Sequence, residues 1–368
     1  METREAARGD LVGEAIARAG AGQCVVWIEN TVSSAQEVYR TVVAEKRQDS
    51  FDVGLLNSRF PAFRRKELED YWMRILGREG PRPNGCILVA TQVVEQSVDI
   101  DADFMITANA PMDLILQRAG RLWRHSRSGR PTDGPELLVR ASPGLNASKS
   151  PEECKKILEP DGLIYHPCLL YRSYLILKSL TAIRLPRDIR QLTEIGAVNP
   201  PNSPKWLDEL SREYEQACNE RKMKAQGNAN IDGFSDDEEY APTRWNERPM
   251  AKLLLINSFD SDGRIIQLEL SDGKSVRIFV GERDIGVARH LHQNLVPVPW
   301  RRGMSEERRL GEKWLSPLIF GGIVPLIVSG EECSNLAGKT MPICYNKNIG
   351  VFFRQPANSK GAFDEFVW

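Results

Sequence analysis

Histidine is scarce in this sequence, with only four among 368 residues, and none of them is followed by an aspartate. A nuclease centre that binds metal through a His-Asp pair and further histidines is difficult to build from that supply. Two histidines flank a leucine in "HLH" at 290–292, which we interpret as a strand or loop pair rather than as metal ligands. We therefore expect no metal site in the chain.

The cysteines also lack the spacing of a metal-binding or redox pair. None of the seven lies in a C-x-x-C pattern, and their number is odd. Scattered cysteines of this kind are typical of reduced thiols in a cytoplasmic protein, most of them packed as small apolar groups.

Long apolar runs are missing too. None approaches the length of about 18 residues that a membrane helix needs, so we expect no membrane partner. The first 20 residues are charged and helical in pattern, which argues against a signal peptide and for a cytoplasmic location.

Positive and negative charges are balanced over the sequence: Lys and Arg total 49 against 50 Asp and Glu, a net charge of −1. This balance excludes a uniformly basic nucleic-acid-binding protein, so any nucleic-acid site must be a local patch.

Short apolar runs alternate with amphipathic segments over residues 1–145. Unbroken runs such as "CVVWI" at 24–28 and "CILVAT" at 86–91 are typical of buried parallel strands. The predicted strands are 24–28, 51–57, 86–91, 104–108 and 135–141, and the predicted helices are 2–20, 34–47, 62–76 and 111–124. Ser33 or Ser34 is the expected cap of the second helix. This alternation predicts an α/β domain, a parallel sheet with helices on both faces.

The remainder of the chain divides into three predicted regions. Residues 146–226 are helical in pattern, and we interpret them as a helical linker region. Residues 227–245 are polar, acidic and glycine-containing, which favours a flexible loop; 228–239 have the spacing of a calcium loop but lack its first aspartate. Residues 246–368 begin with apolar runs separated by "DSDG" and "SDGK" turns, which predicts a small mixed α+β C-terminal domain.

Polar residues follow four successive predicted strands, at the edge where a parallel sheet binds its ligands. Hydroxyl and amide groups at such positions suit phosphate oxygens, and carboxylates suit ribose hydroxyls. Singly, each residue is more often a helix cap or a solvated side chain, and only the joint arrangement indicates one polar rim. Its candidate residues are Asn30, Thr31, Ser58, Arg59, Thr91, Gln92, Glu95, Ser97, Asp99 and Asp101, and "NAPMD" follows the fourth strand.

The stretch "QRAGRLWRH" at 117–125 carries four cationic residues, three arginines and a histidine, in nine positions. Arg121 and Arg124 lie three residues apart, a spacing that places them on one face of the helix predicted at 111–124. Arginine suits a polyphosphate because its charge is permanent and its planar fork matches phosphate oxygens. Arginine-rich helices are more often solvated faces, so this segment alone does not decide between the two interpretations.

Together, "ATQVVEQSVDID" at 90–101 and "QRAGRLWRH" resemble motifs five and six of superfamily-two helicases, most specifically those of the CRISPR-associated helicase–nuclease of type I systems. "NTVSSAQEVY" and "LLNSRFPAFRRKELE" are similar to earlier second-lobe motifs of that family. The specific resemblance covers about residues 24–125, and a weaker one continues into "LIYHPCLLYRSYLIL" and "PTRW". It implies a second RecA-like lobe at 1–145, followed by the linker and the C-terminal domain. A lobe from an unrelated superfamily-two RNA helicase or repair enzyme stays open as an alternative.

The resemblance also implies a role for each candidate residue. Arg121 and Arg124 correspond to the pair that reaches the ATP γ-phosphate, and Gln117 helps to close the nucleotide cleft. Asp99 corresponds to the carboxylate that binds the ribose, with Glu95 in the same nucleotide-binding set. Such enzymes contact the backbone of single-stranded DNA, which carries no sequence preference. The residues implied for these contacts are Thr31, Ser58, Arg59, Thr91 and Gln92.

A complete helicase of this family also has a first lobe with a P-loop and an Mg²⁺-binding acidic motif, neither of which is found here. The G-K-S at 273–275 is preceded by Leu268 where a P-loop needs glycine. The HD nuclease domain is missing as well. We therefore expect ATP and Mg²⁺ to bind only when the first lobe is supplied in cis or in trans, and we expect the chain alone to be inactive.

Two functions remain open from the sequence. The first is the C-terminal part of an ATP-dependent single-strand DNA translocase of type I CRISPR interference. Its partners would be single-stranded DNA, the first lobe with the HD nuclease, and a guide-RNA surveillance complex. The alternative is a non-catalytic accessory subunit that binds DNA, the surveillance complex or the full-length helicase–nuclease. The ATP-facing residues favour the first, since a scaffold would not need them.

Overall fold

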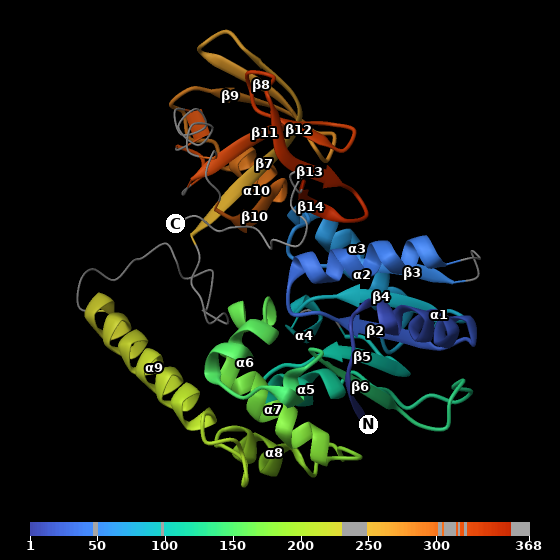
Figure 1. Cartoon of the computed structure of the whole chain (residues 1–368). Coiled ribbons are helices and arrows are strands. Elements are labelled where there is room, and N and C mark those ends of the chain that lie inside the picture. Colours follow the sequence, from blue (N-terminus) through green and yellow to red (C-terminus); the bar gives the residue numbers. More distant parts are fainter. Residues whose placement is uncertain are drawn as a thin grey trace. The chain divides into compact units, whose positions relative to one another are not determined.

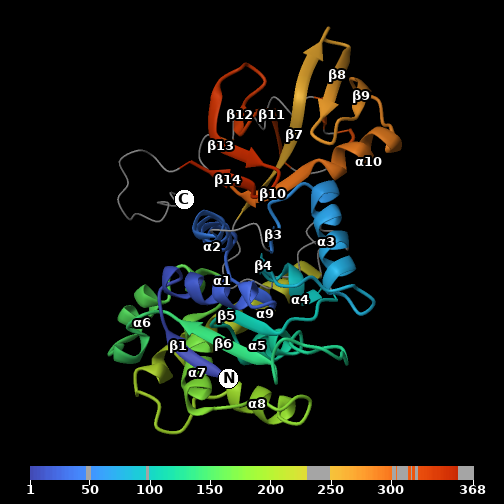
Figure 2. The same ribbon diagram turned by 90° about the vertical axis from the view of Figure 1, so that its right-hand side faces the viewer.

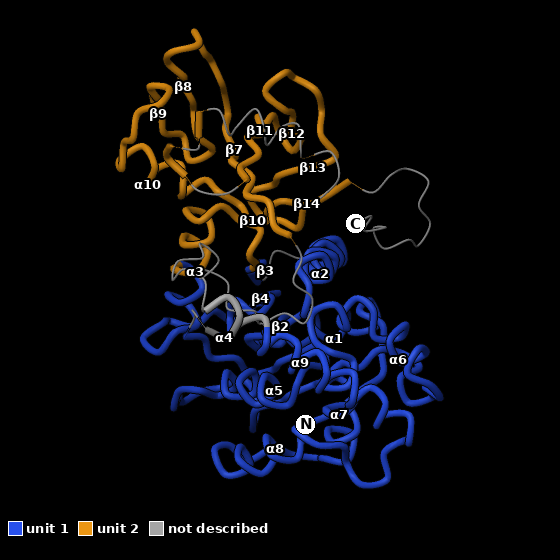
Figure 3. The backbone as a smooth tube through the Cα atoms, turned by 90° about the vertical axis from the view of Figure 1, so that its left-hand side faces the viewer, with its two compact units in different colours: residues 1–56, 71–247 blue, residues 57–70, 248–368 orange. Residues whose placement is uncertain are grey.

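The computed structural model describes residues 1–46, 51–96, 99–229, 249–300, 304, 314–315, 317–319 and 322–354. Its internal contacts divide the chain into two compact units, coloured separately in Figure 3: residues 1–56 with 71–247, and residues 57–70 with 248–368. The sequence-based boundaries at 145, 226 and 245 stay a prediction. Most of the predicted acidic loop, and of the calcium-loop spacing inside it, lies outside the described residues.

The first unit is built on a six-stranded sheet with the strand order β1-β6-β5-β2-β4-β3, in which every neighbouring pair runs parallel. The strands are β1 (Glu2–Glu5), β2 (Cys24–Ile28), β3 (Asp52–Leu56), β4 (Cys86–Ala90), β5 (Phe104–Ala108) and β6 (Glu136–Ala141). β2, β4 and β5 are buried along their whole length, as their unbroken apolar runs predicted. The predicted parallel α/β fold of this region is confirmed.

Helices cover both faces of this sheet. Figure 2 shows α1 (Val12–Gly20) and α2 (Val32–Glu45) on one face, with α4 (Val93–Gln96) and α5 (Met112–Ala119) on the other. Right-handed crossovers place helices on both faces, because the chain first moves across the sheet towards β3 and then returns in the opposite direction towards β6. α3 (Ala62–Leu76) connects β3 to β4. Its Trp72 packs on Gly54 of β3, where any Cβ would overlap the indole ring.

The predicted helix at 2–20 is wrong over its first part. Residues Glu2–Glu5 form β1, an edge strand that runs parallel to β6, and the helix is confined to α1 after a 3-10 turn at Gly9–Leu11. Pairing with the backbone of β6 outweighs the helical composition of this short charged segment, because tertiary context overrides propensity.

Four further helices follow β6 and belong to the first unit (Figure 1): α6 (Pro151–Ile157), α7 (Pro167–Ser179), α8 (Ile189–Gly196) and α9 (Leu207–Ala229). Short 3-10 turns at Leu145–Ala147 and Asp161–Leu163 join the first two of them to the chain before them. α7 is the buried helix of the group and contacts β1, α6, α8 and α9. The helical pattern predicted for 146–226 is therefore present.

The second unit contains a mixed sheet of eight strands. Seven follow the order β14-β13-β12-β11-β7-β8-β9, and the eighth, β10, pairs with β7. The strands are β7 (Met250–Ser261), β8 (Ile265–Leu270), β9 (Ser275–Phe279), β10 (Leu295–Pro299), β11 (Ile323–Ser329), β12 (Glu332–Ser334), β13 (Thr340–Asn346) and β14 (Gly350–Phe353). β11 runs parallel to β7, whereas the other pairs are antiparallel. The predicted mixed character of this region is confirmed.

The long strand β7 supplies a core on each face of that sheet. Leu253 and Leu255 join one apolar cluster, and Leu254 and Ile256 join another, as the two-residue period of a strand requires. The helix α10 (Ile285–Gln293) contributes Leu291 to the second cluster. The histidines of "HLH" lie on this helix, so their assignment to a strand or loop is wrong.

Candidate functional site

The loop after α5 carries the two arginines that the sequence assigns to the nucleotide. α5 ends at Ala119 with Gly120 as its C-cap, and Arg121 and Arg124 lie beyond it. Leu122 forms an isolated parallel bridge with Ala102, and Trp123 has a φ of 45°, so the chain leaves the helical path here. The predicted placement of both arginines on one helix face is wrong. Gln117 stays on the exposed side of the last turn of α5.

Arg118 is fully buried and joins three elements, although the sequence interpretation gave it no role. Its guanidinium donates to Glu95 Oε1 at 2.7 Å, to Thr107 Oγ1 at 2.8 Å and to Asn30 Oδ1 at 3.1 Å. It also donates to the carbonyl of Ala108 at 3.1 Å. The burial of Arg118 could have been predicted from its spacing, because it lies three residues after Ile115 and therefore on the same buried face of α5. Glu95 is thus engaged with Arg118.

Arg121 and Arg124 approach the segment between α4 and β5. Arg121 donates to the carbonyl of Glu95 at 2.6 Å, and Arg124 Nε lies 2.6 Å from Asp99 Oδ1. His125 Nε2 lies 3.2 Å from the second oxygen of Asp99. Burial and the charge of Arg124 lower the pKa of Arg121, whereas the charges of Asp99 and Glu95 act in the opposite direction. The structure thus brings Glu95, Asp99, Arg121 and Arg124 together.

The carboxyl ends of the central strands form one hydrogen-bonded rim, as predicted for a parallel sheet. Asn30, after β2, donates to the carbonyl of Asn109, after β5, at 2.8 Å. Gln92, after β4, donates to the carbonyl of Asn30 at 2.9 Å and to the hydroxyl of Tyr165 at 3.1 Å. Tyr165 lies near the start of α7, so sequence order gave no indication of this contact.

Two threonines of the rim have local structural roles. Thr31 is the N-cap of α2: its hydroxyl oxygen accepts from the amide of Ser34 at 3.1 Å. The expected cap at Ser33 or Ser34 is therefore wrong, because the helix begins earlier than its polar pattern indicated. Thr91 is buried, and its amide donates to the carbonyl of Leu56 at 3.1 Å, which joins the ends of β4 and β3.

Ser58 and Arg59, the other predicted DNA contacts, belong to the second unit. The carbonyl of Arg59 accepts from the amide of Val351 at 2.8 Å, and its guanidinium lies 5.2 Å from the ring centre of Phe353. Gly350 makes this contact possible, since its φ is +82° and a Cβ there would lie 2.6 Å from the Arg59 carbonyl oxygen.

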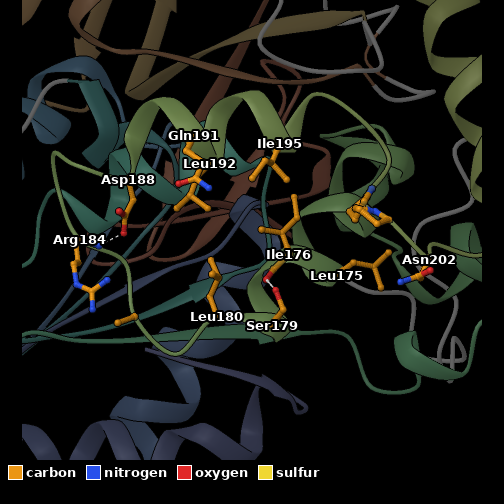
Figure 4. A pocket seen from close by; sticks show the side chains of 13 residues that line it. Leu175, Ile176, Ser179, Leu180, Arg184, Asp188, Gln191, Leu192, Ile195 and Asn202 are labelled. Atoms are coloured by element: carbon orange, nitrogen blue, oxygen red, sulfur yellow. Dashed lines mark hydrogen bonds between the residues drawn. The ribbon is translucent and has the colours of Figure 1, made fainter.

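A cavity of about 510 Å³ lies elsewhere in the first unit, between α7 and α8 (Figure 4). Aliphatic side chains of both helices line it, with Arg184 and Asp188 at one side. It contains no candidate residue from the sequence. Within the described ranges, no group of three metal-ligating side chains is present, and no helix is long and apolar enough to cross a membrane.

Comparison with known proteins identifies the family. Residues 21–127, which hold the rim and both arginines, match the family model of the CRISPR-associated nuclease/helicase Cas3, C-terminal. This chain matches the C-terminal half of the Cas3 helicase–nuclease family, within superfamily two. The Cas3 endonuclease/helicase of Escherichia coli is 32% identical over 307 residues. That match covers 79% of this chain and 32% of the relative, so the chain spans about a third of that Cas3 protein's length.

Solved Cas3 structures share the fold of nearly the whole chain. T. fusca Cas3 with ATP has a TM-score of 0.69 and 23% identity, covering 96% of this chain and 42% of that one. A chain of a CRISPR RNA-guided surveillance complex in a pre-nicking state has a TM-score of 0.64 and 22% identity, covering 96% and 44%. The Cas3 fold therefore includes both units described above.

Proposed function

We propose that this chain supplies the second half of the ATP cleft, and part of the DNA track, of a cytoplasmic CRISPR-associated DNA translocase. Arg121 and Arg124 would contact the γ-phosphate, Gln117 would line the cleft, and Asp99 with Glu95 would complete the nucleotide set. ATP and Mg²⁺ would be held mainly by a first lobe, which also carries the nuclease in cis or in trans. The bound nucleotide would supply the energy for translocation.

The observation that carries this proposal is the cluster that Glu95 and Asp99 form with the two arginines of the loop after α5. Arg124 forms an ion pair with Asp99, and Arg121 donates to the carbonyl of Glu95. Guanidinium groups bind phosphate oxygens, and a carboxylate can accept from a ribose hydroxyl. Two arginines and a carboxylate held together in this way suit a nucleotide.

The fit to a nucleotide also depends on access. The side chain of Arg124 is 40% exposed and that of Asp99 is 46% exposed, so both can reach a ligand without opening the core. Without a nucleotide, Arg124 and Asp99 pair with each other. A bound nucleotide would replace this ion pair, with a phosphate contacting Arg124 and a ribose hydroxyl contacting Asp99. Arg118 is different, because complete burial leaves it a structural role.

The DNA contacts form the second part of the proposal. Thr31, Thr91 and Gln92 lie on the rim of the first unit. Ser58 and Arg59 lie in the second unit, and we propose each of them as a contact with the DNA backbone. The Cas3 relatives include a chain solved in a surveillance complex. This likeness supports a type I guide-RNA surveillance complex as the partner that would deliver single-stranded DNA.

Mixing experiments test the proposal. The purified chain alone should show no ATP hydrolysis. Addition of a first-lobe polypeptide from the same source should raise DNA-dependent hydrolysis about 100-fold or more above either part. No hydrolysis from the mixture or from a linked fusion of the two would contradict the proposal and favour a non-catalytic accessory subunit.

A binding measurement tests the DNA contacts separately. The chain should bind single-stranded DNA, and the affinity should fall steeply as salt rises from about 50 to about 200 mM, because phosphate contacts release counterions. Binding that is absent at low salt would contradict the proposed DNA track.

A further inference from the structure

Two completely buried carboxylates, Asp101 and Asp103, lie under the arginine loop just before β5. Three arginines surround them. Arg130 donates to Asp101 at 2.8 Å and to Asp103 at 3.1 Å, and Arg127 Nε donates to Asp101 at 2.9 Å. Arg82 donates to Asp101 at 3.1 Å and forms an ion pair with Asp103. Buried charges persist only when paired and hydrogen-bonded in this way.

Asp101 also holds the backbone of the arginine loop. Its Oδ1 accepts from the amide of Arg124 at 2.9 Å. The neighbouring Ala102 donates to the carbonyl of Arg121 at 2.9 Å and accepts from the amide of Trp123 at 3.0 Å. These three contacts fix residues 121–124 to Asp101 and Ala102, just before β5. The bond that the Asp101 carboxylate accepts is charge-assisted and therefore the strongest kind among them.

We propose that Asp101 is a positioning residue for Arg124. Its carboxylate fixes the Arg124 amide, so that the side chain leaves the loop on the side of Asp99 rather than into solvent. Arg130 reinforces this placement, since its guanidinium lies 4.7 Å from the ring centre of Trp123 and bonds to Asp101 at the same time. The proposal rests on the proposed function insofar as Arg124 serves the nucleotide.

Asp103 provides a matched control. It is as buried as Asp101 and shares Arg82 and Arg130 with it. Its remaining contact, however, is to the amide of Cys24 at 2.9 Å, at the start of β2. No contact between its carboxylate and residues 121–125 occurs among the described residues. Loss of either carboxylate therefore disturbs Arg82 and Arg130, whereas only loss of Asp101 also removes the contacts with Arg127 and with the Arg124 amide.

The first test measures amide hydrogen exchange in the chain alone, which requires no first lobe. We expect exchange of the Arg124 amide to rise about tenfold or more in Asp101→Asn, because a charge-assisted bond is weakened. In Asp103→Asn the rise at this amide should stay below about threefold, while the Cys24 amide exchanges faster. An unchanged Arg124 amide in Asp101→Asn, or an equal rise in both variants, would overturn the proposal.

The second test separates turnover from binding in the mixture with the first lobe. Asp101→Asn should lower kcat for ATP about 100-fold with little change in KM, because a displaced Arg124 is missed mainly in the transition state. Asp103→Asn should keep most of kcat. Equal losses of kcat in the two variants would show a merely structural role.

The two tests distinguish failure of the proposed function from failure of the proposed role of Asp101. If the wild-type mixture has no ATPase activity, the proposed function fails, but the exchange result still decides whether Asp101 holds the loop. If Asp101→Asn does not fold, Arg127→Gln replaces it, since Arg127 is partly exposed and bonds to Asp101 but not to Asp103. Faster exchange at Arg124 in Arg127→Gln supports the proposal, and wild-type exchange overturns it.

Discussion

At the residue scale, Arg118 holds together segments that are distant in the sequence. Its buried guanidinium donates to Glu95 of α4, to Thr107 of β5 and to Asn30 after β2. The carbonyl of the same Glu95 accepts from Arg121, so Arg118 fixes a residue that Arg121 contacts. Within this motif, Arg118 therefore has a structural role, and the proposed nucleotide contacts belong to Arg121 and Arg124.

Arg118→Lys should destabilise the chain by about 3 kcal/mol. Lysine keeps the charge, but its single nitrogen cannot reproduce the fork that satisfies all these acceptors, and buried polar groups would lose partners. Urea unfolding followed by circular dichroism measures the change. Arg190→Lys is the control, because the side chain of Arg190 is 90% exposed, and it should change stability by less than about 0.5 kcal/mol. Equal effects of the two substitutions would contradict this role of Arg118.

At the scale of elements, α7 depends on an unusual cap. His166 is its N-cap, and Nδ1 accepts from the amide of Cys168 at 3.2 Å. Only an unprotonated Nδ1 can accept this bond, and burial lowers the pKa of His166 from 6.5 to about 4. α7 contacts β1 and three other helices, so this one cap affects the packing of a large part of the first unit.

The cap predicts a pH dependence of stability. Between pH 6.5 and about 4 the unfolded chain binds a proton at His166 that the folded chain does not, so the contribution of this group is complete above pH 6.5 and is lost as pH falls to about 4. The loss should be at most about 3 kcal/mol. His166→Asn keeps a capping oxygen without titrating, so its free energy of unfolding should fall less over this range. Parallel pH profiles of the two proteins would contradict the assignment.

On the scale of the whole molecule, the chain crosses between its units three times, and the second unit contains residues 57–70 as well as 248–368. The early segment is packed there through the Arg59 carbonyl and through Phe60, which is fully buried. Residues 57–70 are thus built into the same unit as the C-terminal residues. Cutting the chain near residue 246, as the sequence pattern suggests, would separate this segment from its partners.

Gly350→Ala tests that packing. Alanine there requires a strained positive φ and also contacts the Arg59 carbonyl, so we expect a loss of about 3 kcal/mol in the unfolding free energy of the second unit. Gly338→Ala is the control, because Gly338 has a φ of +81° but open space around its Cβ position. It should cost only about 1 kcal/mol. Equal losses would show that the 57–70 segment does not press on β14.

The sequence predicted the structure best where a local pattern of residues was compatible with a single interpretation. Apolar runs identified β2, β4 and β5, and motif spacing placed Glu95, Asp99, Arg121 and Arg124 in one cluster. Arg121 and Arg124 were assigned to the helix predicted at 111–124, whereas α5 ends at Ala119 and Leu122 forms an isolated bridge beyond it. The contact of Gln92 with Tyr165 joins residues 73 positions apart, which no local pattern could indicate.

The most direct measurement of the central claim is the ATPase rate of this chain mixed with a first lobe, compared between wild type, Arg124→Ala and Arg190→Ala. If Arg124 contacts the γ-phosphate, Arg124→Ala should lower kcat about 100-fold or more, because a cation aimed at the transition state is lost. Arg190→Ala removes an exposed arginine of α8 and should retain the wild-type rate. A mixture in which Arg124→Ala hydrolyses ATP as fast as wild type would contradict the account.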